Sequence, residues 1–316
     1  MGAGNSFADL MVTQKSQGTT KLEKIHGLVR WERFRYRLKK ILDRSGQGPT
    51  GYDPLQLFQA LLLQNLYGLS DPEMEEMLYD RISFRRFCNF GLSDKIPDET
   101  TLCRFRGALQ GHTEKLFQMV MEEIGKQGIK VKRGAIVDAT VIKSSVRPPK
   151  GGEVSKKDPE AGWTKKGGKY IHGYKAHVSS DKDTGLIKRV IATSGNVHDS
   201  QVFAPLLKGD EEEVYADKAY GSSKNRELLR SHGIEDKIMY KRSRGMKDLP
   251  SWQVNLNKLW SKTRCNIERI FAHWKTEMGL QKSRYKGWDR HQVHFDLMAM
   301  AYNLSRSVSL LRKQTG

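Results

Sequence analysis

The eight residues at positions 135–142, AIVDATVI, constrain the fold of this chain more than any other stretch. They are nearly all apolar and several are β-branched, which is typical of a strand covered on both faces. Asp138 lies in the middle of this strand, on the same side as Ile136, Thr140 and Ile142. An ionised carboxylate there is costly unless a partner or a metal ion compensates its charge; a structural aspartate bonded to nearby backbone is the alternative.

Further strands and helices follow in an order that predicts an α/β fold, with a mixed sheet covered by helices. Strands are predicted at 172–181, 185–195, 213–217 and 235–240, and helices at 198–208 and 222–233. Residues 143–171 form a mobile basic loop in this prediction, and residues 240–258 a basic irregular insertion. Asp217 ends the strand at 213–217, where open sheets commonly place their sites. If the two strands are neighbours, Asp138 and Asp217 converge at one sheet edge.

A third carboxylate candidate is carried by a predicted helix at 261–279. Arg264, Glu268 and Lys275 fall within about 60° of one another on it, beside an apolar stripe that packs on the sheet. The stripe consists of Ile267, Phe271, Trp274 and Met278. A salt bridge between Arg264 and Glu268 at the i, i+4 spacing is the structural alternative for the charged stripe.

The first part of the chain is predicted to be helical. Residues 1–50 are expected to form a flexible basic arm and helix, residues 51–130 a helical DNA-binding domain, and residues 131–316 the catalytic domain. Asp53 before Pro54, the Ser70 and Glu73 pair, and the sequence IPDETT each predict a helix start. Later helices of this region carry Arg85, Arg86, Arg104 and Arg106. Short helices with paired arginines fit a helix-turn-helix-like DNA reader, and a plain helical packing module fits equally well.

The net charge of the chain indicates which class of partner it binds. Lys and Arg number 55 against 36 Asp and Glu among 316 residues, a formal net charge of +19, which favours a polyanion such as nucleic acid. No apolar run approaches the ~20 residues needed to span a bilayer, and the start lacks a signal-peptide pattern, so a cytoplasmic protein without a membrane partner is expected. The three scattered cysteines indicate neither a disulfide framework nor a zinc site.

An ordered series of motifs resembles the DDE transposases of bacterial insertion sequences, in the insertion sequence five/four-like superfamily whose helix motif is Tyr-x2-Arg-x3-Glu-x6-Lys. Arg264, Glu268 and Lys275 match at the required spacings, and Ser261 stands where the family usually has tyrosine, where it can still donate a hydrogen bond. The resemblance continues in VDAT around Asp138, GYKAHV, GNVHDS, ADKAYG around Asp217, SRYKG and DETTLCRFR. It covers most of the chain from about residue 51 to 310.

This resemblance implies a ribonuclease-H-like core in which Asp138, Asp217 and Glu268 hold two Mg²⁺ ions, for which Mn²⁺ can substitute. Hard oxygen ligands suit Mg²⁺, and a metal pair can activate a water or a DNA 3′-hydroxyl. Arg264 and Lys275 would contact the phosphates beside the scissile bond.

Other residues are candidates for DNA contact or for accessory roles. In GNVHDS, Asp199 is expected to cap the following helix and His198 to pack beside the site. Basic segments with aromatic residues fit the backbone and an unpaired base, although solvated charge explains the 143–171 loop equally well. The DNA-contact candidates are Lys175, Lys165, Lys166, Trp163, Arg284, Lys286, Arg104 and Arg106.

The predicted function is cut-and-paste DNA transposition. The helical domain would recognise terminal inverted repeats of double-stranded DNA, and the core would cut the strand and join its 3′-OH to target DNA, as a homodimer on DNA at the bacterial nucleoid. A non-transposing nuclease and a catalytically inert DNA-binding regulator on the same fold are the alternatives.

Overall fold

The computed structural model describes residues 20–42, 51–150, 153–242 and 245–315. The chain divides into two compact units, one comprising Met1–Ile129 with Asp296–Gly316 and the other Lys130–Phe295. The predicted arm at 1–19 and the break at 43–50 lie outside the described residues. No helix in the described ranges combines the length and apolarity that a membrane crossing requires.

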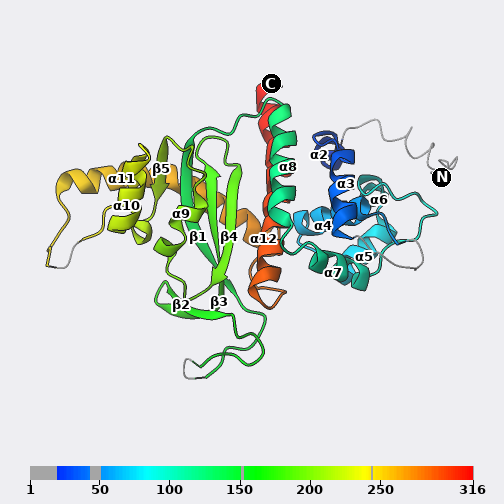
Figure 1. Cartoon of the computed structure of the whole chain (residues 1–316), viewed down its shortest axis with the longest axis horizontal. Coiled ribbons are helices and arrows are strands. Elements are labelled where there is room, and N and C mark those ends of the chain that lie inside the picture. Colours follow the sequence, from blue (N-terminus) through cyan, green and yellow to red (C-terminus); the bar gives the residue numbers. More distant parts are fainter. Residues whose placement is uncertain (1–19, 43–50, 151–152, 243–244, 316) are drawn as a thin grey trace. The chain divides into compact units, whose positions relative to one another are not determined.

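The first unit is helical, as predicted (Figure 1). Its helices are α2 (Lys21–Gly27), α3 (Glu32–Ile41), α4 (Pro54–Leu66), α5 (Asp71–Asp80), α6 (Ile82–Phe87), α7 (Glu99–Ala108) and α8 (Thr113–Lys126). The basic helix expected within residues 1–50 is divided into two helices, α2 and α3. The division between the units falls inside α12 (Trp288–Thr315), whose part from Asp296 onward belongs here and not with the sheet. Thr113 donates to Asp296 at 2.6 Å, which ties α8 to α12.

The helix starts follow the predicted capping chemistry. Asp53 accepts from the backbone N–H of Leu55 ahead of α4, with Pro54 at the first position. Ser70 and Glu73 form a complete capping box on α5. These predictions were correct because a cap depends on residues within one turn of one another.

The second unit contains a six-stranded mixed sheet. Its strands are β1 (Gly134–Lys143), β2 (Gly162–Lys166), β3 (Lys169–Asp181), β4 (Ile187–Ser194), β5 (Glu213–Ala216) and β6 (Glu235–Ile238). β1 is central: it pairs antiparallel with β3 and parallel with β5, β3 also pairs antiparallel with β4, and β5 pairs parallel with β6. The strand order β4-β3-β1-β5-β6 is that of a ribonuclease-H-like core, as predicted. The loop expected at 143–171 was wrong in part, because β2 and the start of β3 lie inside it.

Helices cover both faces of this sheet. On one face Ala135, Val137, Val214 and Ala216 pack with residues of α9 (Phe203–Leu206) and α10 (Ser223–Ser231). Against β1 and β5 lies α11 (Ser251–Thr276), which begins inside the predicted 240–258 insertion. Its apolar stripe is confirmed: Ile267, Phe271, Trp274 and Met278 are all buried. Side chains alternate along β1, so Asp138 points to the opposite face from Val137.

Two of the candidate DNA-binding arginines have different environments. Arg104 is exposed on α7. Arg106 is 5% exposed, forms an ion pair with Asp71 and donates to Gln64 Oε1 at 2.9 Å. The Arg106 guanidinium is thus used within the helical unit, and Arg104 is the more accessible of the two DNA-contact candidates. Arg85 is likewise buried and donates to the backbone carbonyl of Leu78 at 2.9 Å.

We expect Arg106→Ala to lower the free energy of unfolding by about 3 kcal/mol, because it deletes one partner of a largely buried ion pair. Urea denaturation followed by circular dichroism measures it. Arg104→Ala is the matched control and should change stability by less than about 0.5 kcal/mol. Equal losses for the two variants would contradict the structural role of Arg106.

Candidate active site

Asp138 is held in a largely buried position on the central strand. Its side chain is 18% exposed, and Oδ2 lies 2.5 Å from Arg264 Nη1. Oδ1 accepts a 2.8 Å hydrogen bond from the backbone N–H of Ala139. The pKa of Asp138 is raised to about 6, chiefly by burial and in part by the charge of Asp217, while Arg264 and the Ala139 hydrogen bond act to lower it. The carboxylate therefore lies where more positive charge would stabilise it.

Asp217 follows β5 directly, at the carboxyl end predicted from the sequence. In the parallel pairing of β1 with β5, Val137 is opposite Ala216. Asp138 is the next residue of β1 and Asp217 is the first residue after β5, so the two carboxylates come from neighbouring strands, which run ~4.8 Å apart in a sheet. Asp217 also caps the 3-10 turn η2 (Lys218–Tyr220), where it accepts from the Lys218 N–H at 2.7 Å.

Glu268 is connected to Asp138 through Arg264. Arg264 Nη2 donates to Glu268 Oε1 at 2.8 Å while Nη1 contacts Asp138. The predicted i, i+4 pair is thus present, and it is extended to the sheet by Asp138. Glu268 is 57% exposed and Asp138 18%, so Glu268 is the more accessible of these two acids. Ser261, half-buried, lies three residues before Arg264 on α11.

The Arg264 guanidinium joins two of the three acids, Asp138 and Glu268. Among the described residues no group of three or more His, Cys, Asp or Glu side chains is placed to hold a metal ion. The donor chemistry nevertheless fits a hard cation, because all three groups are carboxylates and Asp138 and Glu268 already share one positive charge.

Two lysines add positive charge near the acids. Lys166, exposed at the end of β2, lowers the pKa of Asp138 through its charge. Lys275 is half-buried on α11, and its pKa is lowered first by burial and then by the charge of Lys166. Two like charges this close to one another are suited to an anionic ligand.

The GNVHDS segment differs from the prediction. His198, not Asp199, caps the short 3-10 turn η1 (Asp199–Gln201), with its ring nitrogen accepting from the Ser200 N–H. Asp199 instead forms an ion pair with Lys175 at 2.8 Å, and Lys175 also donates to the Val197 carbonyl at 2.8 Å. Because Lys175 is 9% exposed and its charge is neutralised internally, its proposed phosphate contact is not supported.

The other predicted cations form an exposed group. Lys165, Arg284 and Lys286 are all exposed. Tyr170 is 71% exposed beneath the Lys165 ammonium, at 5.5 Å from its ring centre. Trp163, in contrast, is half-buried with its ring 5.2 Å from that of His172, so Tyr170 is the more accessible stacking surface.

A buried carboxylate that the sequence analysis missed fixes two of these basic segments. Asp158 is 1% exposed and accepts from Ser144 Oγ at 2.7 Å, from the Tyr174 hydroxyl at 2.5 Å and from the Gly287 N–H at 3.2 Å. It therefore joins the segment after β1 to the segment that carries Arg284 and Lys286. The three donors lie far apart in the sequence, so local patterns give no signal for this role.

Asn225 was also missed. It is 4% exposed at the start of α10, and its side-chain amide donates to the carbonyls of Ser200 at 3.0 Å and Tyr220 at 2.8 Å. These bonds fasten η2, the turn capped by Asp217, to η1. In the sequence an asparagine at a helix start indicates only capping.

Comparison with known proteins adds an independent finding. The family model described as transposase DDE domain matches residues 129–304. A second model, transposase domain (DUF772), matches residues 10–108.

Three solved structures are similar at low identity. A cryo-EM structure of a piggyBac transposase synaptic complex with hairpin DNA is 10% identical, with a TM-score of 0.47, covering 93% of this chain and 74% of that one. The crystal structure of the Mos1 strand transfer complex is 10% identical, with a TM-score of 0.21 and coverages of 81% and 87%. The Mos1 transposase paired-end complex with the left transposon end is 14% identical, with a TM-score of 0.22 and coverages of 90% and 95%.

The raised pKa of Asp138 predicts a pH dependence of stability in metal-free protein. Between about pH 4 and pH 6 the unfolded chain has lost this proton and the folded chain retains it, so the free energy of unfolding falls as pH rises. We expect wild type to lose about 3 kcal/mol across this interval relative to Asp138→Asn. Urea denaturation in EDTA at a series of pH values measures the difference, and parallel curves for the two proteins would contradict it.

Proposed function

This chain belongs to the transposase DDE domain family, and from that premise we propose that Asp138, Asp217 and Glu268 are its catalytic carboxylates. The protein is a DDE-type DNA transposase. The observation that carries the site assignment is the sharing of Arg264 between Asp138 and Glu268, with Asp217 at the next strand end. These three acids stand in the order Asp, Asp, Glu along the chain, on β1, after β5 and on α11.

Members of this family use divalent metal ions. We propose that Asp138, Asp217 and Glu268 would hold two Mg²⁺ ions, with Mn²⁺ as a substitute, which when bound would activate the attacking oxygen and stabilise the leaving one. The partly buried Asp138 supports this, since its raised pKa reflects a carboxylate whose negative charge is under-compensated.

Arg264 would change partners during the reaction. It neutralises Asp138 and Glu268 in the DNA-free chain. When it is not paired with these carboxylates, the Arg264 guanidinium can donate two hydrogen bonds to a phosphate. Lys275 and Lys166, already close to the acids, would add charge along the same stretch of DNA backbone.

At the level of the whole reaction we propose cut-and-paste transposition. The helical unit with the exposed Arg104 would bind the terminal inverted repeats, and two copies of the chain would hold two ends. The sheet unit would hydrolyse the strand at the element end and then transfer its 3′-OH to target DNA. The exposed Lys165, Arg284 and Lys286 would track the duplex phosphates. Such an enzyme would act at the nucleoid in the cytoplasm.

We expect Asp217→Asn and Glu268→Gln each to reduce Mg²⁺-dependent nicking at a labelled element end by at least about a hundredfold, because each removes a metal-ligand charge. Denaturing gel electrophoresis of the labelled strand measures cleavage. DNA binding in EDTA should be retained, since cations carry that affinity.

Glu277→Gln provides the matched control, because it makes the same chemical change at the exposed end of α11. Its nicking rate should equal that of wild type. An Asp217→Asn protein that cuts normally would rule out the proposed site. Cleaved ends that are never joined to target DNA would rule out strand transfer and leave a nuclease.

A further inference from the structure

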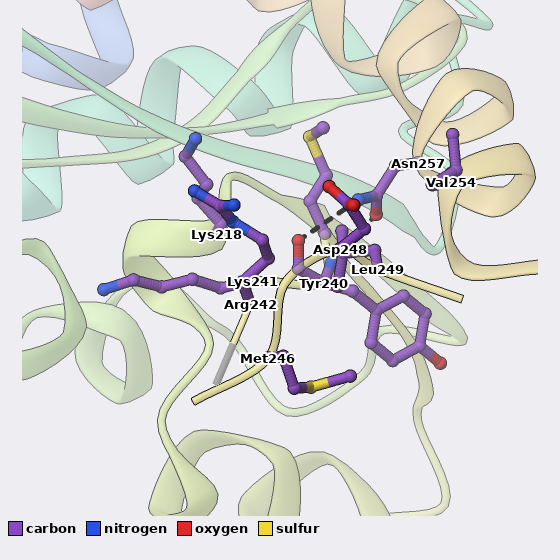
Figure 2. Close-up of a pocket in the computed structure, with 10 residues that line it drawn as sticks. Lys218, Tyr240, Lys241, Arg242, Met246, Asp248, Leu249, Val254 and Asn257 are labelled. Carbon is purple, nitrogen blue, oxygen red and sulfur yellow. Dashed lines mark hydrogen bonds between the residues drawn. The ribbon is translucent and has the colours of Figure 1, made fainter. Parts of the chain in front are cut away.

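A pocket of about 1070 Å³ opens beside Asp217 and is not used by the mechanism above. It lies where the chain leaves the carboxyl ends of the parallel strands β5 and β6, the edge at which open α/β sheets bind ligands. Its lining includes Lys218, Met239, Tyr240, Lys241, Arg242 and Leu249 (Figure 2). Lys218 follows Asp217 directly, so the pocket adjoins the chain at Asp217.

The pocket has one cationic side and one apolar side. Figure 2 shows Lys218, Lys241 and Arg242 together on one side, and Leu249, Val254 and the Tyr240 ring on the other. Among the described residues that line the pocket, Asp248 is the one acid beside these three cations. Arg242 is positioned by a 2.8 Å hydrogen bond from Nη1 to the Lys247 carbonyl. The arrangement fits a ligand that is anionic at one end and flat or apolar at the other.

The apolar side is held rigidly by α11. Asn257 accepts from the Tyr240 N–H at 2.8 Å and donates to its carbonyl at 3.1 Å. The Tyr240 ring stacks on Trp260 at 5.5 Å and meets Trp252 edge-on at 5.3 Å. The Arg226 guanidinium also lies over the Tyr240 ring, 5.2 Å from its centre, so this fixed side of the pocket offers Leu249, Val254 and the edge of Tyr240 for contact with a sugar.

We propose that this pocket binds the 5′-phosphorylated end of a cleaved DNA strand. The inference rests on the proposed function, in which water attacks phosphorus and the bond from phosphorus to the 3′ oxygen breaks. That oxygen leaves as the 3′-hydroxyl after gaining a proton, and the phosphate stays on the other fragment as a 5′-monoester. A monoester carries close to two negative charges at pH 7, against one for an internal diester.

The extra charge gives the pocket its selectivity. Three cations within one pocket attract a monoester more strongly than a diester or a hydroxyl end, while the terminal nucleoside rests against Tyr240. Retention of this product end next to Asp217 would keep the cut strands together until the 3′-hydroxyl is used.

The test compares 5′-phosphorylated tetrathymidylate with its 5′-hydroxyl counterpart, titrated into the full chain in EDTA while tryptophan fluorescence is recorded. Trp252 and Trp260 touch the Tyr240 ring and report on the pocket. We expect wild type to prefer the phosphorylated oligonucleotide by about tenfold. The double variant Lys241→Gln, Arg242→Gln should lose this preference, whereas Lys208→Gln, Lys224→Gln, which removes the same charge outside the pocket lining, should keep it.

Equal affinity of wild type for the two oligonucleotides, or a preference that survives in the pocket variant, would overturn the proposal. The titration requires no metal and no cleavage, so it is independent of the nicking assay. Active cleavage with equal affinities would remove the pocket assignment alone. A preserved phosphate preference without any cleavage would support the pocket while removing the catalytic assignment.

Discussion

A carboxylate on a strand that is covered on both faces is the constraint on which this structure depends. Burial makes the ionised form of Asp138 unfavourable, and a positive charge from outside the sheet compensates for it. Arg264 must therefore be on the helix that crosses β1, with its guanidinium at the height of Asp138. The buried stripe of α11 fixes that height, because Ile267 and Trp274 pack where no polar side chain could replace them. Core packing and site electrostatics thus determine the same helix position.

The same contact explains how one helix serves both stability and chemistry. In the DNA-free chain Arg264 stabilises two acids that would otherwise repel each other. Under the proposed mechanism a divalent cation takes over this role, so that the acids keep a positive partner throughout. The exposure of Glu268 at 57% leaves an open side through which an ion and a phosphate can approach. A site closed on all sides by carboxylates would be more costly to fold and harder to reach.

A feature could be predicted from the sequence when the residues that determine it are close together along the chain. Helix caps such as Asp53, the buried β1 strand and the apolar stripe of α11 follow from residues within a few positions of one another, and they were correct. β2 was missed because GWTKK is polar and charged, and becomes a strand only by pairing with β3. Arg104 and Arg106 are indistinguishable locally, yet the ion pair to Asp71, 35 residues away, buries one of them. The candidate acids were chosen by motif order, whereas their bridging by Arg264 required the tertiary structure.

Asp158 has a consequence for how this molecule can vary. One side chain gathers donors from the segment after β1, from β3 and from the turn before α12. Each of these donors satisfies a lone pair that would otherwise be buried without a partner. An insertion or deletion in the segment after β1, or in the turn before α12, would move a donor away from Asp158, even if the change itself lay at an exposed position. Related chains should therefore change the lengths of these two segments together or not at all, and a graft of one segment alone should fold poorly.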